Sequence, residues 1–181
     1  MKLSRWEHYA QKVIFGDVTQ LVATQGKFIR LGGISYTEFK LYLMSLIWRM
    51  GVSTLDFFAG VKLGPYEQKL RHRLIHDDPG EPHEYPCIIT GVLFQGKFEP
   101  AWISPPNLVK VDNAHCYRCI ISGVLYCFSV TERGISIDAS QVSINKAGNF
   151  LMSVERLEDI AFLYKYVLQH NKALNMSGTS R

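Results

Sequence analysis

The first half of the chain carries apolar residues at the three- and four-residue spacing that is typical of helices. Ser4 and Glu7 have the spacing of a capping box, in which a hydroxyl and a carboxylate satisfy free backbone donors where a helix starts. A first helix is therefore predicted from this box up to Gly16. After it, Thr24–Leu31 is predicted to form one short strand that ends at the Gly-Gly pair 32–33.

The most apolar stretch of the chain follows a second capping box, which runs from Ser35 to Glu38. Large apolar residues in this stretch surround the predicted helix axis instead of forming one stripe, which indicates a helix that is buried on most sides. We therefore predict a helix over Tyr36–Met50 that is ended by Gly51. This helix is expected to lie at the centre of the core.

Two shorter helical elements are predicted next. Thr54–Ala59 has the pattern of a helical turn, and Gly64-Pro65 begins a third helix because proline suits the first helical position. The apolar stripe of this third helix consists of Leu63, Tyr66, Leu70 and Leu74. The turn-rich sequence Asp77–Pro82 ends it.

From Tyr85 onward the alternation of apolar residues predicts an antiparallel sheet. The candidate strands are Cys87–Phe94, Phe98–Ile103, Leu108–Val111, Cys116–Ser122, Val124–Thr131 and Phe150–Ser153. A last helix is predicted over Leu157–Ala173, because apolar residues there return to one helical side. The sequence thus predicts an α+β fold in which a helical N-terminal half packs on a mainly antiparallel β-sheet, with a C-terminal helix.

Length and composition restrict the class of protein. The chain has 181 residues, of which 47% are hydrophobic and 12% aromatic, so disorder is excluded and a core can form without a metal or a disulfide. Chains split into separate cores only beyond roughly 250 residues. A single globular domain is therefore predicted over residues 1–174, followed by a flexible tail at 175–181.

Charge, cysteine content and apolar stretches indicate the setting of the protein. A formal net charge of +4 permits contact with nucleic acid without requiring it, and four cysteines are too few for a disulfide-stapled secreted scaffold. Trp6, Glu7 and His8 occupy the place of the apolar region of a secretory signal. The most apolar stretch is shorter than the roughly 20 residues that span a bilayer. We predict a cytoplasmic protein without membrane contact.

A Cys-x-x-Cys pair, Cys116 and Cys119, has the spacing of two zinc ligands or of a redox dithiol. The pair falls in a predicted strand, where residues three apart point to opposite faces, so the sulfurs would share a metal only across a local turn. The sequence contains neither the second ligand pair of a zinc ribbon nor the helix start of a thioredoxin-like site. We interpret these cysteines, like Cys87 and Cys127, as small buried residues.

A possible metal site begins with His72 and His76, which are four residues apart on the third helix, the spacing that aims two imidazoles at one metal. A metalloprotease has glutamate where this chain has Arg73, so a base is missing there. Asp77 and Asp78 would supply carboxylates if the following loop folded back. The other polar candidates in that loop are Glu81, His83 and Glu84. A solvated loop is the alternative interpretation.

The third helix is also basic, because it carries Lys69, Arg71 and Arg73 beside its two histidines. These side chains are candidates for contact with nucleic-acid phosphates, with binding that weakens as salt rises. A solvated helix face explains the same residues without a partner. The sequence contains neither a phosphate-binding glycine-rich loop nor the GxSxG nucleophile motif.

Four segments follow one another along the chain: LSRWEHYAQKVIFGD, GISYTEFKLYLMSLIWRMGVS, LGPYEQKLRHRL and DDPGEPHEYPCII. In this order, from about Leu3 to Leu174, the chain resembles an uncharacterised family of bacterial proteins associated with mobile elements or phage defence. Longer members start with a Cys-x-x-Cys zinc-knuckle segment that is described as HNH-endonuclease-like. That pair is missing here. There are three alternative explanations: the knuckle is dispensable, the start codon is placed too late, or the chain is a shortened relative. The resemblance therefore implies no functional residue.

These observations favour an accessory binding module of a bacterial system that contacts a protein or nucleic-acid partner and has no catalysis of its own. Its candidate contacts are Lys69, Arg71 and Arg73, and no cofactor is predicted. The alternative is a metal-dependent nuclease or hydrolase. In that case His72, His76 and the adjacent carboxylates hold a divalent ion that activates water.

Overall fold

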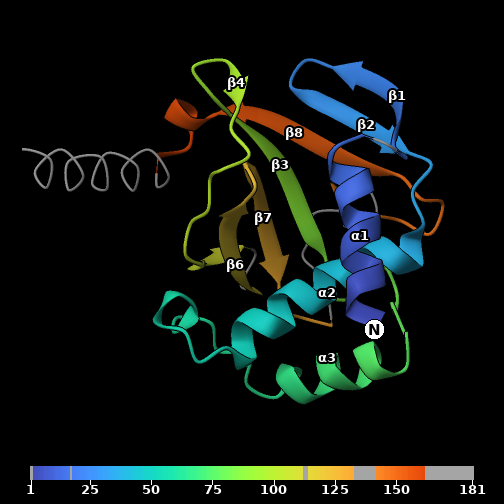
Figure 1. Ribbon diagram of the computed structural model, residues 1–181, viewed down its shortest axis with the longest axis vertical. Coiled ribbons are helices and arrows are strands. Elements are labelled where there is room, and N and C mark those ends of the chain that lie inside the picture. The colour runs from blue at the N-terminus through green and yellow to red at the C-terminus, as the bar shows by residue number, and fades with distance from the viewer. Residues whose placement is uncertain (1, 17, 112–113, 133–141, 162–181) are drawn as a thin grey trace, which may run out of the picture.

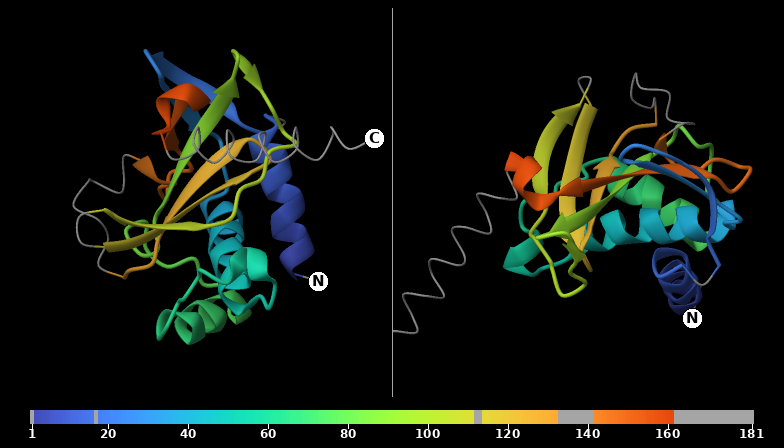
Figure 2. Two further views of the ribbon diagram at one scale, coloured as in Figure 1. Left: turned by 90° about the vertical axis from the view of Figure 1, so that its left-hand side faces the viewer. Right: turned by 90° about the horizontal axis from the view of Figure 1, so that it is seen from above.

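The computed structural model describes residues 2–16, 18–111, 114–132 and 142–161 of the chain. Within these ranges three α-helices lie on one side of a single β-sheet, as Figures 1 and 2 show. The α+β class predicted from the sequence is confirmed, with the helices early in the chain and most strands later. None of the helices in these ranges combines the length and the apolar character needed to cross a membrane.

The helical elements are α1 (Lys2–Ile14), α2 (Tyr36–Val52) and α3 (Tyr66–Ile75), with two short 3-10 helices, η1 (Asp56–Phe58) and η2 (Leu157–Asp159). The strands are β1 (Gln20–Gln25), β2 (Phe28–Gly32), β3 (Cys87–Phe94), β4 (Lys97–Phe98), β5 (Asn107–Val111), β6 (Ala114–Ile121), β7 (Val124–Ser129) and β8 (Phe150–Arg156). The three helices and the helical turn predicted before residue 77, and the strands β3, β5, β6, β7 and β8, are confirmed as elements, with ends that differ by a few residues.

One sheet unites strands from both halves of the chain. Its eight strands follow the order β1-β2-β8-β3-β7-β6-β5, with β4 paired to β3 beside this path. Neighbouring strands are antiparallel except β3 and β8, which run parallel. The late strand β8 therefore lies between the early hairpin β1–β2 and β3, and it joins the two parts of the sheet (Figure 1).

The prediction of one strand over Thr24–Leu31 is wrong, because this segment contains the turn of a hairpin. β1 ends at Gln25, β2 starts at Phe28, and the two strands pair antiparallel. Gly26 makes the turn with a φ of 58°, a backbone conformation that glycine adopts without steric cost. The polar Gln-Gly-Lys sequence at this point is the turn signal that the prediction overlooked.

Two other predicted elements differ from the structure. The strand predicted over Phe98–Ile103 is reduced to the two residues of β4, and Pro100 follows closely, a residue that cannot donate to a ladder hydrogen bond. The C-terminal helix predicted over Leu157–Ala173 begins as the 3-10 turn η2. The greater part of that prediction, from residue 162 on, lies outside the described residues, as do the predicted tail and part of the predicted domain span.

The core is centred on α2, as the all-round apolar pattern of this helix predicts. The Ser35 hydroxyl caps the helix by accepting a hydrogen bond from the Glu38 amide at 3.4 Å. Ten residues of α2 are buried, and α1 and α3 both pack on it. A smaller apolar cluster, built around Val92 and Leu157, lies on the other face of the sheet. The three helices thus share one core on one side of the sheet.

Candidate functional site

The two histidines of the predicted metal site face each other on the exposed side of α3. The His72 and His76 rings contact each other in a tilted arrangement, with their centroids 4.2 Å apart and their planes inclined by 32°. Nδ1 of His76 is 2.8 Å from the His72 carbonyl oxygen, and because a carbonyl only accepts, this nitrogen carries the donated proton. One of the four ring nitrogens is therefore already engaged with the backbone of α3.

Three of the loop carboxylates that were considered for the metal site are bound to cations instead. Asp78 and Glu84 accept from the Arg73 guanidinium at 3.1 and 2.6 Å, and Glu81 pairs with Lys146 at 2.6 Å. Among the described residues no three histidine, cysteine, aspartate or glutamate side chains come together to hold a metal ion. The predicted set His72, His76, Asp77 and Asp78 is therefore not assembled. These ion pairs stabilise the conformation of the loop after α3.

Arg73 pairs with two carboxylates of this loop, so we expect it to stabilise the folded protein. Its side chain is 19% exposed and that of Glu84 is 16% exposed, which makes this ion pair largely shielded from water. We expect Arg73→Gln to lower the free energy of unfolding by about 2 kcal/mol, because a nearly buried carboxylate loses its partner. Urea unfolding measures the change. Arg71→Gln, on the same helix, is the matched control, and an equal effect of both substitutions would contradict the assignment.

The Cys-x-x-Cys pair is divided between the two faces of the sheet, as its position in a strand predicts. Cys119 belongs to the core beneath the helices, whereas the unbroken register of β6 turns Cys116 to the other face. Both cysteines are buried, as is Cys87, and none of the three is part of a disulfide. Burial raises the pKa of the Cys119 thiol to about 12 and that of Cys87 well above its usual value. These thiols are therefore protonated at neutral pH and poor nucleophiles.

Lys40 is a buried charge that the sequence analysis missed. Its side chain lies in the core, and Nζ donates to the carbonyl oxygens of Glu84 and Tyr85 at 2.6 and 3.1 Å. Burial lowers the pKa of Lys40 to about 8, the effect expected when an ammonium group is withdrawn from water. A lysine inside a helix that is apolar on all sides was the available signal. Its amine holds the end of the loop and is enclosed by protein.

The three cations of α3 differ in their partners. Lys69 pairs with Glu132 at 2.6 Å, and Arg73 is held by the two carboxylates of the loop. Arg71 is exposed and forms no ion pair with any residue that the structure describes, Glu67 one helical turn earlier included. Two of the three predicted nucleic-acid contacts are thus neutralised within the protein. Of these three cations, Arg71 is the one without a carboxylate partner among the described residues.

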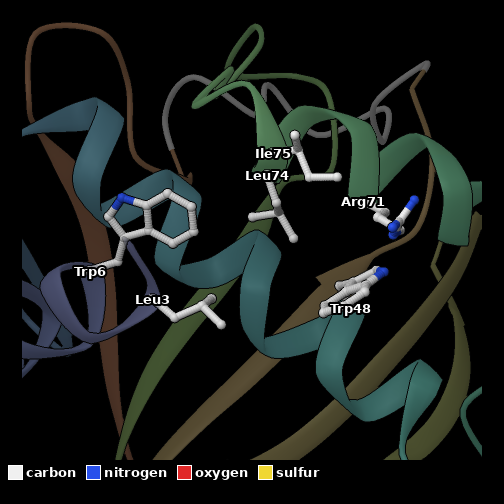
Figure 3. A pocket seen from close by; sticks show the side chains of 6 residues that line it. All are labelled: Leu3, Trp6, Trp48, Arg71, Leu74 and Ile75. Carbon is white, nitrogen blue, oxygen red and sulfur yellow. The ribbon is translucent and has the colours of Figure 1, made fainter. Parts of the chain in front are cut away.

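Arg71 borders an apolar pocket where the three helices meet. The pocket has a volume of about 310 Å³, and its other lining residues are Leu3 and Trp6 from α1, Trp48 from α2, and Leu74 and Ile75 from α3. Figure 3 shows Trp6 and Leu3 at one end, Arg71 and Trp48 at the other, and the two α3 aliphatic side chains between them. Leu74 was predicted as part of the apolar stripe of α3, but its role in a pocket was not.

Both tryptophans of this pocket have indole N–H groups for which the described residues supply no acceptor. The nitrogens of Trp6 and Trp48 are buried and make no hydrogen bond within the part of the chain that is described. A buried indole N–H usually finds a partner. The nitrogen of Trp48 lies at the Arg71 end of the pocket (Figure 3). This end therefore holds two donors, a guanidinium and an indole N–H, beside an otherwise apolar surface.

Comparison of the chain with family models, with curated proteins and with solved structures gives no match. The resemblance to a bacterial family of mobile elements or phage defence therefore stays a prediction. The function of the pocket has to be argued from its own geometry and chemistry.

Proposed function

We propose that this protein is a binding module for another protein, and that the pocket between α1, α2 and α3 receives an apolar side chain of that partner. The observation that carries the proposal is the pocket itself, a concave site lined by two tryptophans and three aliphatic residues. Ile75 at its rim is 51% exposed, so apolar surface there remains available for burial. A concave apolar site with exposed apolar surface at its rim is typical of binding sites.

The size of the pocket supports a side chain as its occupant. Its volume of about 310 Å³ is at the lower end of the range of roughly 300–1,000 Å³ that small-molecule pockets have. A space of this size accommodates one large apolar group. Aromatic side chains are also enriched where proteins bind one another, since they bury a large area with few rotatable bonds.

The charges of α3 favour a protein over a nucleic acid. Affinity for nucleic acid depends on several cations that neutralise phosphates together. Lys69 and Arg73 are engaged in ion pairs, and the remaining Arg71 lies beside the apolar pocket. The bacterial origin, the cytoplasmic location and the lack of catalysis predicted from the sequence are kept as parts of this proposal.

The two pocket tryptophans provide the test. Trp102 packs on Phe94 outside the pocket, so Trp102→Phe leaves Trp6 and Trp48 as the only tryptophans of the chain. We expect their fluorescence to change saturably when blocked peptides that carry one leucine or phenylalanine are added. Ile75→Gln should weaken this binding about tenfold, because a buried isoleucine contributes roughly 1.5–3 kcal/mol.

The matched control is Ile103→Gln, because Ile103 is 59% exposed and lies outside the pocket. This variant should bind like the parent protein. A fluorescence response that is absent for every apolar peptide, or that both isoleucine variants weaken equally, overturns the proposal. Salt-sensitive retention on immobilised DNA or RNA that Arg71→Gln abolishes and Ile75→Gln leaves intact would favour a nucleic-acid partner instead.

A further inference from the structure

No acceptor from the described part of the chain pairs with the donors at the Arg71 end of the pocket. Within that part Arg71 forms no ion pair, while the other two cations of the same helix pair with carboxylates at 2.6–3.1 Å. The Trp48 indole N–H, which lies at this end, is buried without an acceptor in the described chain (Figure 3). An unpaired buried donor costs free energy that a suitable acceptor recovers.

We propose that the partner segment presents a carboxylate beside its apolar anchor, and that this carboxylate pairs with Arg71 while the anchor lies between Trp6, Trp48 and Leu74. This inference rests on the proposed function and specifies its partner as an acidic, apolar protein segment. Aspartate or glutamate supplies two oxygens, which match the planar fork of a guanidinium. A shift of the long, exposed Arg71 side chain would open the Trp48 N–H to the same carboxylate.

The surroundings of Arg71 explain why one carboxylate suffices. Apart from Arg71 the lining is almost wholly apolar. An ion pair at this end therefore forms in an environment of lower dielectric constant and is screened less than an ion pair in open water. Glu67, one turn earlier on α3, repels any approaching anion, and the repulsion grows with the number of charges, so it opposes a run of phosphates more than a single carboxylate that is paired with Arg71. The charge pattern therefore favours an acidic side chain over a nucleic-acid backbone.

The experiment uses four blocked seven-residue peptides in one serine-glycine host, which combine leucine with glutamate, leucine with glutamine, leucine with lysine, and serine with glutamate. Binding to the Trp102→Phe protein is followed by tryptophan fluorescence up to about 5 mM peptide, a range that covers millimolar affinities. We expect the leucine–glutamate peptide to bind about tenfold more tightly than the leucine–glutamine peptide. Arg71→Gln should remove this difference, and Arg71→Glu should make the leucine–lysine peptide the preferred one.

The matched control is Arg30→Gln, which removes the same charge from an exposed position on β2, away from the pocket. It should keep the full preference for glutamate. Equal binding of all three leucine peptides overturns the inference and leaves the proposed function standing, whereas no binding of any of them overturns both. Binding of the serine–glutamate peptide as tight as that of the leucine–glutamate peptide, or displacement by a short oligothymidylate, also overturns the inference.

Discussion

Phe39→Ala is expected to lower the free energy of unfolding by about 4 kcal/mol, the largest effect among the substitutions considered for this chain. Phe39 is 1% exposed, and its ring stacks on Phe150 with centroids 5.8 Å apart and on Tyr42 at 6.1 Å. Alanine would leave a cavity between α2 and β8. Because β8 joins the early hairpin to the rest of the sheet, this contact connects the central helix to the strand that unites both halves.

Chemical denaturation at neutral pH measures this loss. Phe15→Ala is the control, since Phe15 is 59% exposed and should change the free energy of unfolding by less than about 1 kcal/mol. The denaturant dependence of unfolding should stay the same for both variants if they unfold in one step. Comparable losses for Phe15→Ala and Phe39→Ala would contradict the position given to α2 at the centre of the core.

Local patterns predicted the elements of this fold better than their arrangement. The helix at Tyr36–Val52 was recognised because apolar residues surround its axis, a property of the segment alone. The sequence does not specify that β8 lies parallel to β3, because that pairing joins Thr90 to Ser153 across most of the second half of the chain. The hairpin turn at Gly26 was a local signal, and it was missed because the flanking polar residues blur the two strands.

The candidate site shows the same division. Leu3 and Trp6 lie on α1, Trp48 on α2 and Arg71 on α3, so no short sequence pattern predicts that these residues line one pocket. The sequence indicated the histidine pair and the acidic loop as a possible metal site, because spacing predicts which side chains lie near one another. Spacing does not predict that the carboxylates of the loop form ion pairs with cations of the protein. Arg73, which stands where a metalloprotease needs glutamate, was the available sign that the loop is held by ion pairs.

Lys40 is expected to make the free energy of unfolding depend on pH in the alkaline range. Its pKa is about 8 in the folded protein against 10.5 for an unperturbed lysine, and burial is the main cause. The charges and thiols that face it are Glu84 and Cys87, which favour the ammonium form, and Arg73, which opposes it. The folded state releases this proton at lower pH than the unfolded state does. The contribution of Lys40 to the free energy of unfolding is therefore present above about pH 10.5 and is lost as the pH falls towards 8.

The test compares the parent protein with Lys40→Met under reducing conditions. Between pH 7 and pH 10 the difference in free energy of unfolding should shift by about 2 to 3 kcal/mol in favour of the parent, at roughly 1.4 kcal/mol for each unit of pKa. Burial raises the pKa of Cys87 and Cys119, so their contributions fall with rising pH in both proteins and cancel in the difference. Lys110→Met, at an exposed position, should show no such shift. A flat difference for Lys40→Met would contradict the prediction, because it would mean that the Lys40 amine reaches water and keeps its ordinary pKa in the folded protein.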